Sequence, residues 1–144
     1  PFGDNAQMMY EIEKLGLAFQ CYKPLTIEEG REYLIKSTEI FLDIINSDER
    51  IRPYLSNYPF RASNIRIEIY INNPDFSDLE NGQLEIVESE DGKLVYKTRP
   101  LFKKKGFETV YNESFEEALK RPKVKNPKFP YSKGRNIPLP KKAA

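Results

Sequence analysis

The sequence contains no histidine and a single cysteine, Cys21, and these two shortages exclude several kinds of site. A zinc site of the usual kind needs several His or Cys ligands, and a Ser-His or Cys-His nucleophile pair needs an imidazole base. An internal disulfide needs a second cysteine. We therefore expect no metal, no cofactor and no catalytic residue, and the composition favours a protein that is not an enzyme.

A long apolar run is also missing. No stretch approaches the roughly 18 apolar residues of a membrane span, so we expect no transmembrane segment. The 144 residues fit one domain of ordinary size. Hydrophobic residues make up 39% and charged residues 31%, which is typical of a folded, water-soluble chain rather than a fibrous or disordered one.

Charge divides the chain near its end. Residues 122–144 contain seven Lys or Arg, no acidic residue and five of the eleven prolines, whereas residues 1–121 carry a net charge of −6. Because proline interrupts helices and central strands, we expect an extended tail. This basic tail either docks its apolar side chains on the acidic domain, its own or that of a neighbouring copy, or serves an anionic partner. Those apolar side chains are Phe129, Tyr131, Ile137 and Leu139.

The patterns of apolar residues predict an α+β domain. The strongest is the alternation of four isoleucines from Ile65 to Ile71, which is typical of a strand. Thr26 and Glu29 form a capping box that begins a helix. The expected elements are strands at 15–22, 64–71, 83–89, 93–98 and, shorter, 107–111, a long helix at 27–46 and a short helix at 114–121.

This order, β-α-β-β-β-(β)-α, predicts a curved antiparallel sheet of four to five strands packed on one long helix. The apolar stripe of that helix should face the sheet, and it comprises Ile27, Tyr33, Leu34, Ile40, Phe41, Ile44 and Ile45. The other face of the sheet should carry Arg66, Glu68, Tyr70, Glu85, Val87, Val95 and Lys97. The expected division is an N-terminal segment at 1–14, one domain at 15–121 and the extended tail at 122–144.

The segment between the long helix and the isoleucine strand is rich in Arg, Tyr and Pro. The candidate binding residues are Arg50, Arg52, Tyr54, Tyr58, Arg66 and Tyr70. A guanidinium pairs two oxygens and a phenol donates a further hydrogen bond, so these residue types suit a clamp for a carboxylate or a phosphate. Alternatively, the apolar residues of the segment close the core, while its arginines pair with Asp48, Glu49 or the end of the helix.

Three further chemistries find less support in the spacing. Acidic clusters occur at 48–49, 75–80, 88–91 and 116–117. Nothing in the sequence selects from them the acid and base pair that a glycosidase needs. Residues 72–80 are rich in oxygen ligands but lack the spacing of an EF-hand calcium loop. The lysines at 103–105 lie between aromatic residues and suit a nucleic-acid backbone, but the acidic domain repels a polyanion, which argues against nucleic acid.

The Arg-Tyr segment also carries a family resemblance. The residues concerned are Ile45-Asn46, Ile51-Arg52-Pro53-Tyr54-Leu55, Tyr58-Pro59-Phe60 and Ser114-Phe115-Glu116-Glu117-Ala118. Together they resemble a group of uncharacterised small bacterial proteins that are expected to be exported, over about Leu17 to Leu119. That group has no established activity. The resemblance therefore implies export or a cell-surface location, and it implies no catalytic residue.

These patterns favour a non-enzymatic binding domain, with a protein as the partner or with self-association through the C-terminal tail. The partner would be held by the mixed sheet face, or by the Arg-Tyr segment together with the tail. The alternative is a small hydrolase or a ligand-sequestering protein, which would have a cleft between the helix and the sheet.

Overall fold

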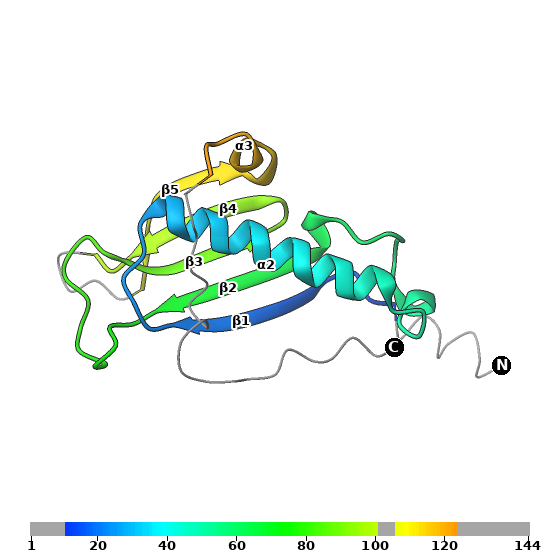
Figure 1. Ribbon diagram of the computed structural model, residues 1–144, viewed down its shortest axis with the longest axis horizontal. Coiled ribbons are helices and arrows are strands. Elements are labelled where there is room, and N and C mark those ends of the chain that lie inside the picture. The colour runs from blue at the N-terminus through cyan, green and yellow to red at the C-terminus, as the bar shows by residue number, and fades with distance from the viewer. Residues whose placement is uncertain (1–10, 101–105, 124–144) are drawn as a thin grey trace.

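The computed structural model describes residues 11–100 and 106–123 (Figure 1). The predictions for the tail beyond Lys123 and for the lysines at 103–105 lie outside these described residues. The strands are β1 (Leu15–Cys21), β2 (Ile65–Ile71), β3 (Leu84–Glu90), β4 (Lys93–Thr98) and β5 (Glu108–Ser114). The helices are α2 (Ile27–Ser47) and α3 (Phe115–Leu119), with short 3-10 turns η1 (Arg52–Tyr54) and η2 (Ala62–Asn64) between α2 and β2.

The five strands form one mixed sheet in the order β1-β2-β3-β4-β5, and α2 packs on one face of it (Figure 1). This arrangement confirms the predicted α+β class and the predicted order of elements. Three of the four strand pairs are antiparallel, as predicted, whereas β1 runs parallel to β2 and makes the sheet mixed. The sheet is mixed because α2 is a crossover connection between β1 and β2, and a crossover returns the chain in the same direction.

The helix and the isoleucine strand form the centre of the core, as predicted. All four isoleucines of β2 are buried beneath α2, and none is more than 4% exposed. Cys21 is also fully buried, as predicted, and burial raises the pKa of its thiol. Gly30 lets the helix approach the sheet closely, because a Cβ added there would lie 3.3 Å from Cγ1 of Val87.

The face of the sheet away from α2 is called the open face below. It carries Arg66, Glu68, Tyr70, Ile86, Glu88, Val95 and Lys97. The prediction that Val87 lies on this face is wrong. A register shift between Leu84 and Ile86 inserts one residue into β3, so Val87 is fully buried under α2 and Ile86 takes the outward position. Glu85 lies within the shift and pairs with Arg99 at 3.1 Å.

The predicted capping box at the start of α2 makes this helix end sensitive to pH. Thr26 Oγ1 accepts a hydrogen bond from the N–H of Glu29, and the Glu29 carboxylate accepts one from the N–H of Thr26, both at 3.1 Å. Partial burial opposes ionisation of Glu29. The Thr26 N–H and the ammonium of Lys23, 3.3 Å away, outweigh that effect and hold the pKa of Glu29 below its usual value.

Stability should therefore fall in acid partly through Glu29. A carboxyl group with a lowered folded-state pKa stabilises the protein above its unfolded pKa, about 4.5 here, and this contribution is lost as the pH falls through the folded pKa. We expect Glu29→Gln to flatten the decline in the free energy of unfolding below that pH, measured by urea titration. Glu28→Gln, in the same turn, is the matched control. Identical profiles for wild type and Glu29→Gln would contradict this prediction.

Candidate functional site

β1 is an edge strand that lacks the features by which proteins usually protect such edges. The strand order begins with β1, so no strand of the described ranges lies on its outer side. Its seven residues, LGLAFQC, include no charge and no proline, and all seven pair with β2 without a register shift. The opposite edge differs, because β5 carries Glu108 and Glu113 and its pairing with β4 contains a register shift. Charges and bulges discourage edge-to-edge pairing, so β1 is the less protected edge of the sheet within 11–100 and 106–123.

The backbone of β1 presents hydrogen-bonding groups outward at every second residue. The N–H of Asn72, directly after β2, donates to the carbonyl of Cys21 at 2.7 Å, so Cys21 directs its backbone groups toward β2. Backbone direction alternates along a strand, and Gly16 and Ala18 therefore direct theirs to the outer side. Both positions lie on the open face, where both residues are exposed. The two residues whose backbone groups point outward from β1 are therefore also small.

On the other face, the flank of α2 next to β1 is apolar and exposed. α2 packs mainly on β2, β3 and β4. Tyr33, Ile40 and Ile44, spaced by seven and four residues, share one side of α2. The ammonium of Lys23, two residues after β1, lies 5.6 Å from the centre of the Tyr33 ring, so this side of the helix faces β1.

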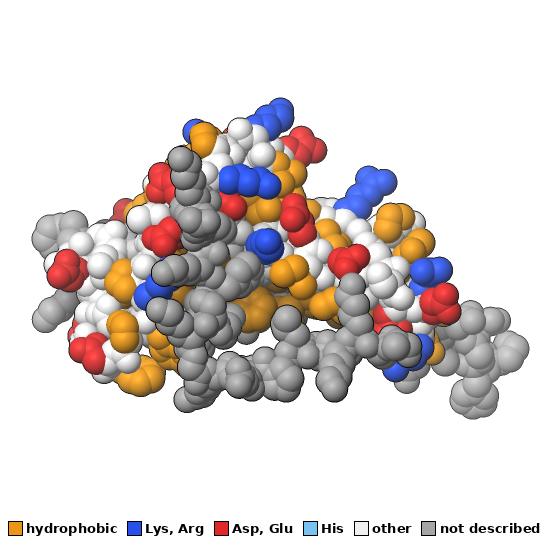
Figure 2. All heavy atoms as spheres, viewed as in Figure 1, with side chains coloured by type: hydrophobic (Ala, Val, Ile, Leu, Met, Phe, Trp, Pro, Cys, Tyr) orange, Lys and Arg blue, Asp and Glu red, His pale blue; other side chains and the backbone are white. Residues whose placement is uncertain are grey.

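The prediction that Ile40 and Ile44 face the sheet is wrong. Only one strand, β1, lies beyond β2 on this side of the described sheet, and it leaves this flank of the helix partly uncovered. Ile40 and Ile44 are 45% and 53% exposed, and Leu17 of β1, on the same face, is 40% exposed. Leu17, Ile40 and Ile44 are together called the apolar flank. Figure 2 views the molecule from the helix side and shows exposed hydrophobic side chains alongside α2. The edge of β1 and the apolar flank, on the same side of the molecule, are together the candidate surface for an apolar polypeptide.

The predicted clamp residues around the C-terminal end of α2 are engaged with their own chain. Arg50 forms a two-pronged pair with Asp48, with Nε 3.1 Å from Oδ1 and NH2 3.0 Å from Oδ2. The Arg52 guanidinium lies 4.3 Å from the centre of the Tyr58 ring, and both side chains donate to the carbonyl of Asn46. They satisfy a helix-end carbonyl that lacks an intrahelical partner. The anion clamp stays a prediction.

The remaining predicted residues lie in two other places. Tyr54 is half exposed in η1. Arg66 and Tyr70 lie on the open face of β2, on either side of Glu68. Arg66 approaches this carboxylate to 2.7 Å and the Tyr70 hydroxyl donates to it, which raises the pKa of Tyr70. The six candidate residues therefore do not converge on one site.

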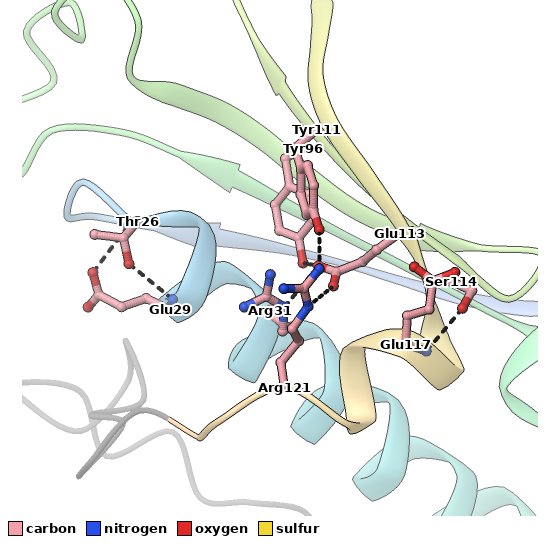
Figure 3. Close-up of polar contacts among 9 residues, drawn as sticks. All are labelled: Thr26, Glu29, Arg31, Tyr96, Tyr111, Glu113, Ser114, Glu117 and Arg121. Carbon is pink, nitrogen blue, oxygen red and sulfur yellow. Dashed lines mark hydrogen bonds and ion pairs between the residues drawn. The ribbon is translucent and has the colours of Figure 1, made fainter.

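A buried ionic cluster, which the sequence analysis missed, joins α2 to the far edge of the sheet (Figure 3). Glu113 of β5 has a fully buried side chain. Its Oε2 accepts hydrogen bonds from Nε of Arg31 and from the hydroxyl of Tyr96, each at 2.8 Å. Arg121, after α3, lies 3.8 Å from the other oxygen and donates to the hydroxyl of Tyr111 at 2.9 Å.

Interactions within this cluster keep the Tyr96 phenol protonated and the Arg31 guanidinium charged. Burial and the carboxylate of Glu113 raise the pKa of Tyr96 well above its usual value, so the phenol stays protonated. Burial opposes the charge of Arg31, but the hydrogen bond and the attraction of Glu113 prevail and raise the pKa of Arg31. Arg31 follows Ile27 by four residues and precedes Leu34 by three, and this spacing was the signal that it lies on the inner side of the helix.

Polar groups of the acidic loop at 72–80 form hydrogen bonds with one another. Asp75 accepts from the N–H of Ser77 at 3.0 Å and from its hydroxyl at 2.6 Å, and these bonds lower the pKa of Asp75. Within 11–100 and 106–123, no group of three or more His, Cys, Asp or Glu residues is placed to hold a metal ion. Two shallow hollows among these residues, about 160 and 310 Å³, lie beside residues 78–85 and 57–64.

Comparisons with protein-family models, with curated proteins and with solved structures give no match to this chain. The resemblance to an exported bacterial group therefore stays a prediction. In the part of the chain that the structure describes, no helix has both the length and the hydropathy that crossing a membrane requires. Functional inference consequently rests on the surfaces of this chain, of which the edge of β1 with the apolar flank is the best defined.

Proposed function

We propose that the protein is a non-enzymatic binding domain that holds an extended segment of a protein partner along β1. The observation that carries this proposal is the uncharged, regular edge strand whose backbone groups at Gly16 and Ala18 point outward. A strand added to such an edge gains main-chain hydrogen bonds at alternate residues, and pockets for its side chains give specificity. The family resemblance supports a setting outside the cell or at the surface of a bacterium.

The two faces of β1 define the chemistry of the partner segment. Partner residues that hydrogen-bond to Gly16 and Ala18 place their side chains on the open face, where the small residues leave room for large ones. The alternate partner residues face Leu17, Ile40 and Ile44 and are therefore apolar. Their N–H groups point away from β1, so proline is acceptable at these positions.

The alternative function, a hydrolase or ligand-sequestering protein, needs a cleft between α2 and the sheet. Leu34, Ile67 and Leu94 fill the space there, and each is fully buried. The hollows beside 57–64 and 78–85 lie at the ends of strands rather than under the helix. No contact described above supports this alternative over strand addition.

A displayed library of random linear peptides, with the full chain as bait, tests the proposal. We expect selected peptides with apolar residues at alternate positions. N-methylation at the hydrogen-bonding positions should weaken binding at least about tenfold, the value of one lost hydrogen bond of ~1.4 kcal/mol, while N-methylation at the intervening positions should have little effect. Affinity can be measured by fluorescence anisotropy.

Two variants of the domain locate the bound peptide. Leu17→Lys places a charge in the apolar flank and should reduce affinity, while Val110→Lys, a matched change of an exposed residue on β5, should preserve it. Circular dichroism verifies that both variants are folded. Peptides whose affinity is indifferent to Leu17→Lys, or equally sensitive to N-methylation at every position, would refute strand addition at β1.

A further inference from the structure

The edge of β1 lies within reach of the chain's own C-terminal tail. Arg121, two residues before the described chain ends, shares Glu113 with Arg31 near the start of α2 (Figure 3), and Figure 1 shows the path of the chain after α3. Residues 22–26 connect the end of β1 to the same end of α2 and span at most about 18 Å when extended. Residues 124–128 are also five in number and have the same maximum reach. A tail that continues from this point along β1 enters at the C-terminal end of the strand and runs antiparallel to it.

The tail sequence alternates with the two-residue period of a strand. Between residues 128 and 140, every large apolar side chain is at an odd-numbered position and every proline is at an even-numbered one. The apolar residues are Phe129, Tyr131, Ile137 and Leu139, and the prolines are Pro130, Pro138 and Pro140. In a strand, side-chain direction and backbone hydrogen-bond direction both repeat every two residues. One orientation therefore satisfies all seven residues at once.

In that orientation the odd-numbered residues hydrogen-bond to β1 and lay their side chains over Gly16 and Ala18 on the open face. The even-numbered residues direct their backbones outward, where the missing N–H of proline leaves no bond unmade. The proline rings then face the apolar flank, beside Leu17. Within residues 129–139, the opposite orientation would put Pro130 and Pro138 against β1 and lose a main-chain hydrogen bond at both.

Charge favours the same association. The described residues contain fourteen Lys or Arg and twenty-one Asp or Glu, a net charge of −7. Residues 124–144 contain six Lys or Arg and no acidic residue. The attraction between the two parts acts within one molecule, so docking of the tail does not depend on protein concentration.

We infer that residues 129–139 form a sixth, antiparallel strand on β1 of the same molecule. This inference rests on the proposed function, because the tail occupies the surface that is proposed to bind the partner. The partner then competes with the tail, and the apparent affinity for the partner falls in proportion to the fraction of molecules whose tail is undocked. The tail acts as a built-in competitor that selects for partners with a better fit to β1.

A pair of proline substitutions in the full chain tests this inference. Lys133→Pro removes an odd-numbered N–H that bonds to β1, whereas Ser132→Pro alters an even-numbered residue that faces outward. Lys133→Gln controls for the lost charge. We expect the Gly16 and Ala18 amides, observed by NMR hydrogen exchange, to be protected in wild type, Ser132→Pro and Lys133→Gln. In Lys133→Pro they should exchange at least about tenfold faster, because local opening becomes easier.

The outcomes separate this inference from the proposed function. Rapid exchange at Gly16 and Ala18 in every variant would show that the tail is not on β1, yet selected peptides would still bind if the proposed function is right. A dimer in sedimentation that Lys133→Pro dissociates would assign the strand to a neighbouring copy and overturn docking within one molecule. Support requires a monomer, protection that depends on odd-numbered positions, and tighter peptide binding by Lys133→Pro than by Ser132→Pro.

Discussion

Replacing Glu113 with Ala will lower the free energy of unfolding by about 3–5 kcal/mol. The Glu113 side chain is fully buried and that of Arg31 is only 8% exposed, so the substitution leaves the guanidinium buried without its counter-ion. The Tyr96 hydroxyl loses its acceptor in the same step. Removing one member of a buried ion pair is costly because the remaining charge can be neither hydrated nor neutralised. Urea denaturation of the wild type and the variant measures the difference.

The double variant Arg31→Met, Glu113→Leu distinguishes a lost charge pair from a lost packing contact. Replacing both charges by apolar side chains of similar size removes the unpaired charge, so most of the stability should return. Glu116→Ala, in the exposed first turn of α3, is the control for a general loss of acidic charge. A loss below about 1 kcal/mol for Glu113→Ala, typical of an exposed pair, would contradict the burial of this cluster.

Leu34→Ala will destabilise the protein by about 2–5 kcal/mol, whereas Ile40→Ala, on the same helix, will cost less than about 1 kcal/mol. Leu34 is fully buried against the sheet, so its truncation removes apolar contact and leaves a cavity. Ile40 is 45% exposed in the apolar flank, and alanine has the higher helix propensity. Thermal or urea unfolding of the two variants provides the comparison.

This pair of variants also tests whether the apolar flank serves binding rather than stability. Ile40→Ala should weaken the selected peptides although it leaves the domain folded, and Leu34→Ala should change affinity only as far as it unfolds the protein. A loss of several kcal/mol for Ile40→Ala would mean that the flank is part of the core. The surface proposed for partner binding would then have to be abandoned.

The local elements could be predicted because short-range physics determines them. The alternation from Ile65 to Ile71 requires a strand with one buried face, and the Thr26 and Glu29 pair satisfies the first N–H groups of a helix. Ser114 likewise accepts a hydrogen bond from the N–H of Glu117 and begins α3. Each of these signals lies within about eight residues of sequence. The order of elements follows from them directly.

Features that depend on distant parts of the chain could not be predicted in the same way. Val87 was misplaced because the extra residue in β3 is visible only in its pairing with β4. Helical periodicity gives the width of an apolar stripe but not the width of the sheet beneath it, which is why Ile40 and Ile44 were expected in the core. The partner of Arg31 lies 82 residues away, at a position no local pattern indicates.

The candidate site was predicted least well because it is defined by what β1 lacks, namely charge, proline and a register shift. The unusual composition of the Arg-Tyr segment suggested a binding site, yet Arg52 and Tyr58 donate hydrogen bonds to a carbonyl at the end of α2. The sequence LGLAFQC is ordinary for a strand and gains meaning only from its place at the border of the sheet. Position in the sheet is a property of the whole fold, and no window of sequence contains it.

The unlike borders of the described sheet limit how far copies could associate by strand pairing. A sheet with two receptive borders can stack copy upon copy into an endless ribbon, as happens in fibres. Here one border is receptive, while the other bears Glu108 and a register shift. Association through strands therefore stops once a single border has been covered. Fibril growth by strand pairing would need a second receptive border, which the described sheet lacks.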